Sequence, residues 1–289
     1  MNPYQKFVNS YAGLYSSGKS LPLGDIPRSP KAELSANAPV ALIFSPHPDD
    51  ECIIGGLALR LLRESGMRIV NVAVTLGSNK ERQQPRLQEL KNACEWIGFE
   101  LQETSANGLE KISLQARTAD PSSWFEKVKV VGEILSKYLP RAIFFPHEAD
   151  WNSSHIGTHF LVMDALKAMP ISFHCLAIET EFWGMMQAPN LMVESKPDEV
   201  ADLLAALSFH VGEVQRNPYH LRLPAWLQDN VRRGAELVGG QGGASPNYVF
   251  ATLYRLRQWK SGGIENVYAG GKLIGATENL GVIFKWLHG

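Results

Sequence analysis

The sequence has no long hydrophobic run, no strong charge of either sign and little cysteine. No stretch approaches the roughly 18 apolar residues of a membrane-spanning helix, and the first residues lack the basic start and apolar core of a secretory signal. A formal net charge of −1 gives no indication of a nucleic-acid or anionic-membrane partner. The cysteines Cys52, Cys94 and Cys175 are odd in number and widely separated in apolar segments, which favours reduced core thiols over disulfides. We therefore expect a soluble globular protein of the cytoplasm.

Strand-like and helix-like segments alternate over the first 180 residues. With 289 residues, 45% of them hydrophobic, the chain can bury a large core as one big domain or two small ones. The expected strands are 39–45, 68–75, 99–103, 141–146 and 174–180, and the expected helices are 50–65, 85–97, 122–139 and 156–168. Such alternation is typical of an α/β fold with a parallel sheet covered by helices on both faces.

Two flanking regions depart from this alternation. Residues 1–37 contain several prolines and a Ser-Ser-Gly segment, and we expect an N-terminal extension without regular order that packs on the surface. Residues 196–289 form a C-terminal α+β extension that completes the same domain as the core, 38–195. The expected elements of this extension are helices at 198–210 and 225–237, a strand at 248–256 and a hairpin at 267–274.

The first polar cluster follows the strand 39–45 directly, in the segment Pro-His-Pro-Asp-Asp-Glu that ends at Glu51. A strand-to-helix turn of an open α/β sheet lies at the carboxyl edge of the strands, where ligands bind. His47 and Asp50 can hold one metal ion, with Asp49 as an unligated carboxylate beside it. A solvated helix N-terminus would explain the acids through the helix dipole, but not a histidine between two prolines.

A second polar loop, 147–159, follows another strand end and contains three histidines, two acids and Asn152. In a parallel sheet this loop and the first one converge at the same edge. A catalytic zinc ion has three protein ligands and an open position, so this loop must supply one ligand. His155 and His159 are four residues apart and can share a helix face, so spacing alone does not choose between them.

The first cluster resembles the signature of the PIG-L/LmbE-like family of zinc-dependent N-deacetylases, and the resemblance covers roughly residues 38–185. Three further segments are similar to the family's pattern: Arg86-x-x-Glu89 on a helix, the loop ending in His155-Ile-Gly-Thr, and Glu179-Thr-Glu181 at a strand end. The resemblance implies a Rossmann-like α/β fold, and an enzyme that removes an N-acetyl or similar acyl group from an amino-sugar or glycoconjugate substrate. It also implies one zinc ion per chain, although two histidines and a carboxylate accept other divalent ions.

Carried over by residue, the resemblance makes His47, Asp50 and His155 the zinc ligands and Asp49 the general base. The family has a histidine where this chain has Asn152. An asparagine amide can donate a hydrogen bond to an oxyanion but cannot protonate a leaving group. We expect Asn152 to be a neutral oxyanion donor, with His147 or His159 as a proton carrier.

The residues that would bind substrate carry weaker signals. The candidates are Arg86, His159, Trp151 and Glu181, with Trp183 as a further ring on which a sugar can stack, and each has an ordinary packing or surface role as its alternative. Loops after residue 75, around 105–120 and in the C-terminal region would select the rest of the substrate. A larger amide conjugate as substrate, or a catalytically weak sugar-binding protein, remain alternatives at this point.

Overall fold

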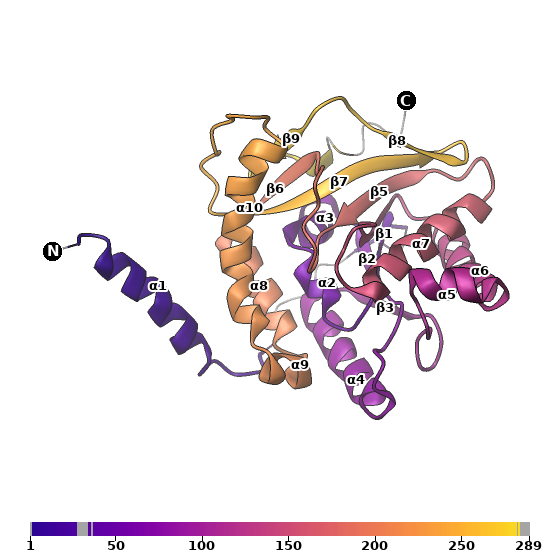
Figure 1. Ribbon diagram of the computed structural model, residues 1–289, viewed down its shortest axis with the longest axis horizontal. Coiled ribbons are helices and arrows are strands. Elements are labelled where there is room, and N and C mark those ends of the chain that lie inside the picture. The colour runs from indigo at the N-terminus through magenta and orange to yellow at the C-terminus, as the bar shows by residue number, and fades with distance from the viewer. Residues whose placement is uncertain (1, 28–33, 36, 282, 284–289) are drawn as a thin grey trace.

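A nine-stranded mixed sheet is the centre of the computed structural model, which describes residues 2–27, 34–35, 37–281 and 283 (Figure 1). Five parallel strands lie in the order β3-β2-β1-β4-β5. They are β1 (Val40–Ser45), β2 (Arg68–Ala73), β3 (Glu100–Glu103), β4 (Ala142–Pro146) and β5 (Cys175–Thr180). All five lie within a residue or two of the expected ranges, which confirms the predicted α/β core.

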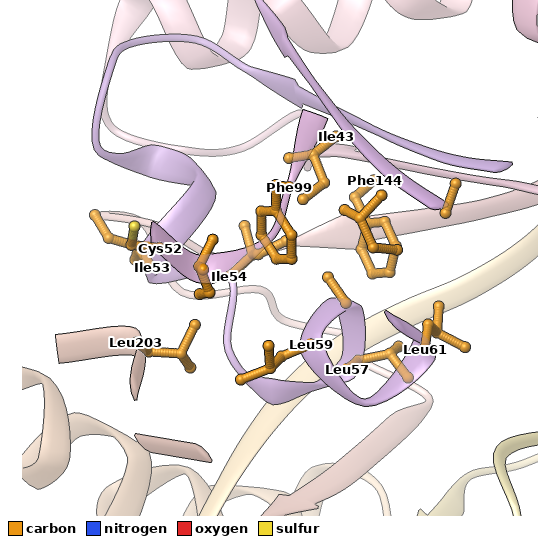
Figure 2. Close-up of a cluster of buried hydrophobic side chains, with 14 of the residues drawn as sticks. Ile43, Cys52, Ile53, Ile54, Leu57, Leu59, Leu61, Phe99, Phe144 and Leu203 are labelled. Carbon is orange, nitrogen blue, oxygen red and sulfur yellow. The ribbon is translucent and has the colours of Figure 1, made fainter. Parts of the chain in front are cut away.

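Helices cover both faces of this parallel part. The elements against one face are α2 (Asp50–Ile53), α3 (Gly56–Ser65), α4 (Lys80–Ile97) and α8 (Pro197–Leu207), and those against the other are α6 (Pro121–Tyr138) and α7 (Ser153–Ala168). A short helix, α5 (Leu114–Ala119), contacts α6 and α7. Alternate residues of β1 point to opposite faces of the sheet. Ile43 therefore packs in the hydrophobic cluster that includes α3, and Leu42 packs in the cluster that includes α6 and α7. Figure 2 shows Leu57, Leu59 and Leu61 of α3 together with Ile43 and Phe144 of the sheet.

The C-terminal extension adds antiparallel pairs to the same sheet. The last strand of the core segment 38–195 is β6 (Leu191–Ser195). The extension begins with α8 and continues with α9 (Val211–Arg216), the 3-10 helix η1 (Tyr219–Arg222), α10 (Leu223–Leu237), β7 (Phe250–Lys260), β8 (Gly263–Asn266) and β9 (Lys272–Ile274). Strand β7 pairs antiparallel with β5, β6 and β8, and β9 pairs parallel with β6. The extension therefore continues the sheet of the core. No described helix has the length and hydropathy that crossing a bilayer requires.

Two predicted elements of the core and the extension are wrong in detail. The single helix 50–65 is broken at Gly55, whose φ of +81° lets the chain approach Thr252, where a Cβ would lie 1.9 Å from the hydroxyl oxygen. The hairpin 267–274 is absent: residues 267–271 form no strand, the preceding β8 pairs with β7, and the following β9 pairs with β6. A hairpin does join β7 to β8, through Ser261 and Gly262, which both have positive φ.

The N-terminal extension contains regular structure, contrary to the prediction. Helix α1 (Gln5–Gly18) forms because Phe7, Tyr11 and Leu14 recur at helical spacing and the prolines lie outside this segment. Figure 1 shows α1 standing apart from the rest of the chain. Near the middle of α1, Tyr11 Oη donates a hydrogen bond to Gln228 Oε1 of α10 at 3.1 Å, which connects the helix to the domain.

Glycine 157 is needed for the packing of α7 against the loop before α5. A Cβ at this position would lie 2.5 Å from the backbone of Ile112 and Ser113, whereas no described atom lies within 4 Å of a Cβ at Gly132 in α6. We expect Gly157→Ala to destabilise the fold by about 1–3 kcal/mol through overpacking. Gly132→Ala, the matched control, is expected to stabilise it by about 0.5–1 kcal/mol. Urea unfolding of both variants measures this, and equal effects would contradict the packing argument.

Candidate functional site

The two polar loops meet at the switch point of the sheet. Strands β1 and β4 are neighbours, and the chain proceeds from them in opposite directions across the sheet. Ligands of open α/β sheets bind in the crevice outside the carboxyl ends of such strands. His47 follows β1, and His155 lies in the first turn of α7, which follows β4. The predicted convergence of the two loops is therefore seen in the structure.

Hydrogen bonds from three elements fix the turn after β1. Thr75 Oγ1 donates to the carbonyl of Pro46 at 2.7 Å, and Arg86 Nη2 of α4 donates to the carbonyl of Pro48 at 2.9 Å. Within the turn, the backbone N–H of His47 donates to Asp50 Oδ2 at 2.8 Å. Arg86 was predicted to bind substrate; in the structure its guanidinium group holds the turn after β1 through the carbonyl of Pro48.

Three ligand atoms converge in this crevice. His47 Nδ1 and His155 Nε2 are 3.2 Å apart, and Asp50 Oδ2 is 3.5 Å from the first and 3.4 Å from the second. A tetrahedral ion with bonds of about 2.0–2.1 Å needs ligand atoms about 3.3–3.4 Å apart. The triangle therefore fits a small divalent ion such as zinc, and these residues can hold one.

The surroundings of His155 support the same interpretation. Its ring is fully buried, and Nδ1 has no hydrogen-bond partner among the described residues but faces Asp150 Oδ1 at 3.6 Å. A histidine that binds a metal through Nε2 carries its proton on Nδ1, which a carboxylate or carbonyl then accepts. Asp150 is itself held by the backbone N–H groups of Asn152, Trp183 and Gly184. It is a residue that the sequence did not single out.

Asp49 lies beside the triangle without being part of it. Burial, and then the charge of Asp50, raise the pKa of Asp49 to about 7, against the opposing effects of His210, Arg86 and Tyr219. Tyr219 Oη donates to Asp49 Oδ2 at 2.5 Å, and Arg86 Nη2 lies 3.9 Å from the same oxygen. No hydrogen bond links Oδ1 to any described residue, so one carboxylate oxygen is available for proton transfer.

A cavity of about 550 Å³ adjoins the triangle. Its walls come from the turn after β1, the loop after β2, the start of α4, the loop before α5 and the start of α7. The lining residues are His47, Thr75, Gly77, Ser78, Lys80, Gln83, Leu109, Glu110, Lys111, Ile112, Ser113, Asn152, Ser153 and Ser154. This volume lies within the range of small-molecule sites. Two of the three regions expected to select the substrate therefore line the cavity, and His47 is the triangle residue that reaches it.

Asn152 lines the cavity as the N-cap of α7. Its Oδ1 accepts the backbone N–H of Ser154 at 2.8 Å, which satisfies one of the free N–H groups of the first turn. The amide nitrogen makes no hydrogen bond to a described residue. The side chain therefore keeps a donor for a ligand, and its predicted oxyanion role stays a prediction.

His159 lies apart from the cavity, one helical turn after His155. Its Nδ1 is 2.9 Å from the carbonyl of Pro146, and burial lowers its pKa. Glu148 and Glu179 are close enough to form a second candidate metal group with it. However, Arg255 bonds both carboxylates and Arg257 also contacts Glu179, so their charge is already balanced. This placement argues against the predicted substrate or proton-carrying role of His159.

Glu148 gives this network a measurable pH dependence. Burial opposes ionisation, but the hydrogen bond and charge of Arg255 lower the pKa of Glu148 from 4.5 to about 2. Its contribution to stability is therefore present above pH 4.5 and is lost as the pH falls towards 2. We expect Glu148→Gln to reduce the free energy of unfolding at neutral pH, and the difference from wild type to shrink in acid. Urea unfolding at several pH values tests this, with exposed Glu126→Gln as a control expected to show little change.

The remaining predicted residues have structural partners or lie at the surface. Both carboxylate oxygens of Glu181 bind Arg233, at 2.7 and 3.0 Å, which argues against a substrate contact. His147 is buried, with Nε2 2.9 Å from the carbonyl of Gly184, so it is not placed to carry protons. Trp151 is 74% exposed. Trp183 packs edge-on against Tyr219 at 5.6 Å and thus lies near Asp49.

Besides Asp150, the sequence analysis missed two further site residues, Tyr219 and His210. Both come from the C-terminal extension, where no motif marks them, and they reach the first loop across 170 and 159 positions of sequence. His210 Nε2 lies 2.7 Å from Glu51 Oε1, and both side chains are fully buried. A histidine in the extension is visible in the sequence, but the contact of His210 with an acid of the first cluster is visible only in the folded chain.

Comparisons with known proteins agree with this geometry. The family described as PIG-L, GlcNAc-PI de-N-acetylase, matches residues 42–166. The probable N-acetyl-alpha-D-glucosaminyl L-malate deacetylase 2 of Bacillus cereus is 27% identical over 196 residues, which is 60% of this chain and 83% of that protein.

Solved structures show the same fold at low identity. The N,N'-diacetylchitobiose deacetylase of Pyrococcus horikoshii has a TM-score of 0.55 and 16% identity, covering 86% of this chain and 92% of its own. The 4-carboxy-2-hydroxymuconate hydratase of Pseudomonas putida KT2440 has a TM-score of 0.54 and 17% identity, covering 75% of this chain and 95% of its own. The fold thus serves more than one reaction, and the motifs carry the assignment. The segment that is similar to the PIG-L family, residues 42–166, contains both polar loops with His47, Asp50 and His155.

Proposed function

We propose that this protein is a zinc-dependent hydrolase that removes an N-acetyl group from an amino-sugar-containing substrate. His47, Asp50 and His155 are its metal ligands, and Asp49 is its general base. The observation that carries the proposal is the triangle of ligand atoms, 3.2 to 3.5 Å on a side, with an unligated buried carboxylate next to it. A structural metal site has no need of the free carboxylate.

The roles of the residues follow from their surroundings. When bound, the metal ion lowers the pKa of water and polarises the amide carbonyl. Asp49 accepts a proton from the attacking water through the oxygen that Tyr219 leaves free. The C–N bond then breaks, and the same carboxyl passes the proton to the departing amine, which yields acetate and a free amino sugar. Asp50 is occupied by both histidines and the turn, which leaves the proton transfer to Asp49.

Amino-sugar substrates are supported by the relatives, whose names describe deacetylation of N-acetylglucosaminyl malate and diacetylchitobiose. A cavity of about 550 Å³ has room for a sugar with a further substituent. Lys80, Lys111 and Ser113 on its walls offer hydrogen bonds to hydroxyl or anionic groups. The identity of that substituent decides between a sugar deacetylase and an amidase for larger conjugates.

Asn152 is proposed as the neutral donor to the oxyanion. Its carbonyl oxygen caps α7, so alanine would remove the cap and the donor together. Asn152→Ser keeps a good N-cap but loses the amide N–H groups. We expect this variant to lower kcat by about 10²-fold, in keeping with the loss of one oxyanion donor. An unchanged kcat would rule out the proposed role.

The first experiment combines metal analysis with acetate release. Purified protein is assayed for zinc and other divalent metals and offered N-acetylglucosamine, diacetylchitobiose and N-acetylglucosaminyl malate, with N-propionyl and N-benzoyl analogues. We expect about one metal ion per chain and acetate release from at least one sugar. Release of only the longer acyl groups would identify an amidase. Metal without hydrolysis would indicate a sugar-binding protein, and absence of metal would refute the proposal.

A further inference from the structure

We propose that the C-terminal extension positions Asp49 from two sides, through Tyr219 at its side chain and through His210 and Glu51 at its backbone. This inference rests on the proposed function, because Asp49 is the base of that reaction. Tyr219 and His210 lie outside the segment that matches the family, residues 42–166. They would be positioning residues that this chain adds to the shared site.

The backbone of Asp49 has a conformation that needs support. Its φ of +115° and ψ of −28° fall where residues other than glycine are uncommon. Such conformations persist when the surrounding structure determines them, and they are frequent at active sites. The N–H of Asp49 donates to Glu51 Oε2 at 3.0 Å, and this bond is the direct support.

His210 in turn fixes Glu51. The other carboxylate oxygen, Oε1, lies 2.7 Å from His210 Nε2 and 3.2 Å from Cys52 Sγ, which donates to it. Burial opposes charge on His210, but the charge and hydrogen bond of Glu51 outweigh this and raise its pKa. His210 is the N-cap residue of α9, so its position depends on the fold of the extension.

Tyr219 holds the carboxylate itself. Its hydroxyl group donates to Oδ2 at 2.5 Å, and its ring is fixed edge-on against Trp183. Burial and the charge of Asp49 raise the pKa of the Tyr219 phenol, so it remains a donor. With Oδ2 held in this way, Oδ1 is the carboxylate oxygen without a described partner. The arrangement would select one rotamer of Asp49 and direct one oxygen to the reaction.

The test uses Tyr219→Phe, which removes one hydroxyl group and keeps the ring against Trp183. We expect kcat to fall about 10- to 100-fold, with KM within about twofold and metal content unchanged, because a misplaced base costs rate rather than binding. Tyr268→Phe is the matched control, since it removes a phenol that bonds the carbonyl of Asn190 in the outer part of the sheet. It is expected to leave kcat unchanged.

A double variant separates positioning from a general structural effect. If Tyr219 acts through Asp49, Tyr219→Phe should lower kcat no further in an Asp49→Asn background. For His210, glutamine can still donate to Glu51 and leucine cannot, so His210→Gln should retain more kcat than His210→Leu. Equal fold-losses from Tyr219→Phe in both backgrounds would overturn the inference.

A structural measurement decides the inference even without turnover. Crystal structures of the metal-loaded wild type and of Tyr219→Phe should show one Asp49 conformer in the first and two or more in the second. The same single conformer in both would refute the positioning role. If the wild type hydrolyses no substrate of the panel, the proposed function fails, while this comparison still reports on Tyr219.

Discussion

Replacing Asp49 by asparagine is expected to lower kcat by about 10²- to 10⁴-fold, the range of general acid–base catalysis, and to leave metal content unchanged. The amide has nearly the same shape and can still accept the hydrogen bond of Tyr219, but it cannot take a proton from water. Asparagine also tolerates positive φ better than most residues, so the backbone at +115° is retained. Steady-state kinetics and metal analysis on the same preparation measure both quantities.

The control for this prediction removes a carboxylate elsewhere. Asp202 of α8 forms an ion pair with Arg63 of α3 at 2.7 Å, and both side chains are partly exposed. Asp202→Asn should therefore change neither kcat nor metal content. If Asp49→Asn kept wild-type kcat, another base would be at work. If it lost the metal as well, Asp49 would belong to the coordination sphere, and the roles of Asp49 and Asp50 would have to be reassigned.

The two polar loops of the candidate site were predictable because their signals are local. A buried strand followed at once by His47, Asp49 and Asp50 fixes both the chemistry and its place at the sheet edge. The second loop follows β4, and the adjacency of β1 and β4 brings the two together. Spacing alone left the choice between His155 and His159 open, and only the resemblance favoured His155. In the structure, His155 is the one that lies 3.2 Å from His47 Nδ1 and 3.4 Å from Asp50 Oδ2.

The supports of the base were not predictable, because they depend on contacts over long sequence separations. Tyr219 sits in a 3-10 helix that no periodicity marks, and Glu51 looked like another acid of a helix N-terminus. The hydrogen bonds of these residues depend on the tertiary structure, in which β7 pairs with β5 and the extension packs against the first loop. The same applies to Glu181. Its position at a strand end suggested a substrate-binding role, but in the structure its carboxylate accepts a hydrogen bond from Arg233.

The likeness to a hydratase shows why the site has to carry the functional argument. A shared arrangement of sheet and helices, here over 75% of this chain at a TM-score of 0.54, does not fix a reaction. What favours amide hydrolysis in this chain is the set of ligand atoms at tetrahedral spacing, the free carboxylate oxygen of Asp49 and the donor of Asn152 at the cavity. Each of these is a separate target for mutation.

Removing His155 tests the metal site most directly. His155→Ala leaves two ligands, so we expect metal affinity to fall by more than the roughly 10- to 100-fold that follows the loss of an outer partner of a ligand. His159→Ala is the matched control, because it removes the same ring one turn later on α7, where the ring bonds Pro146. It should leave the metal bound. Metal titration followed by chromatography and elemental analysis compares the two. The reverse pattern would place the third ligand at His159 and would require the loop after β4 to differ from this structure.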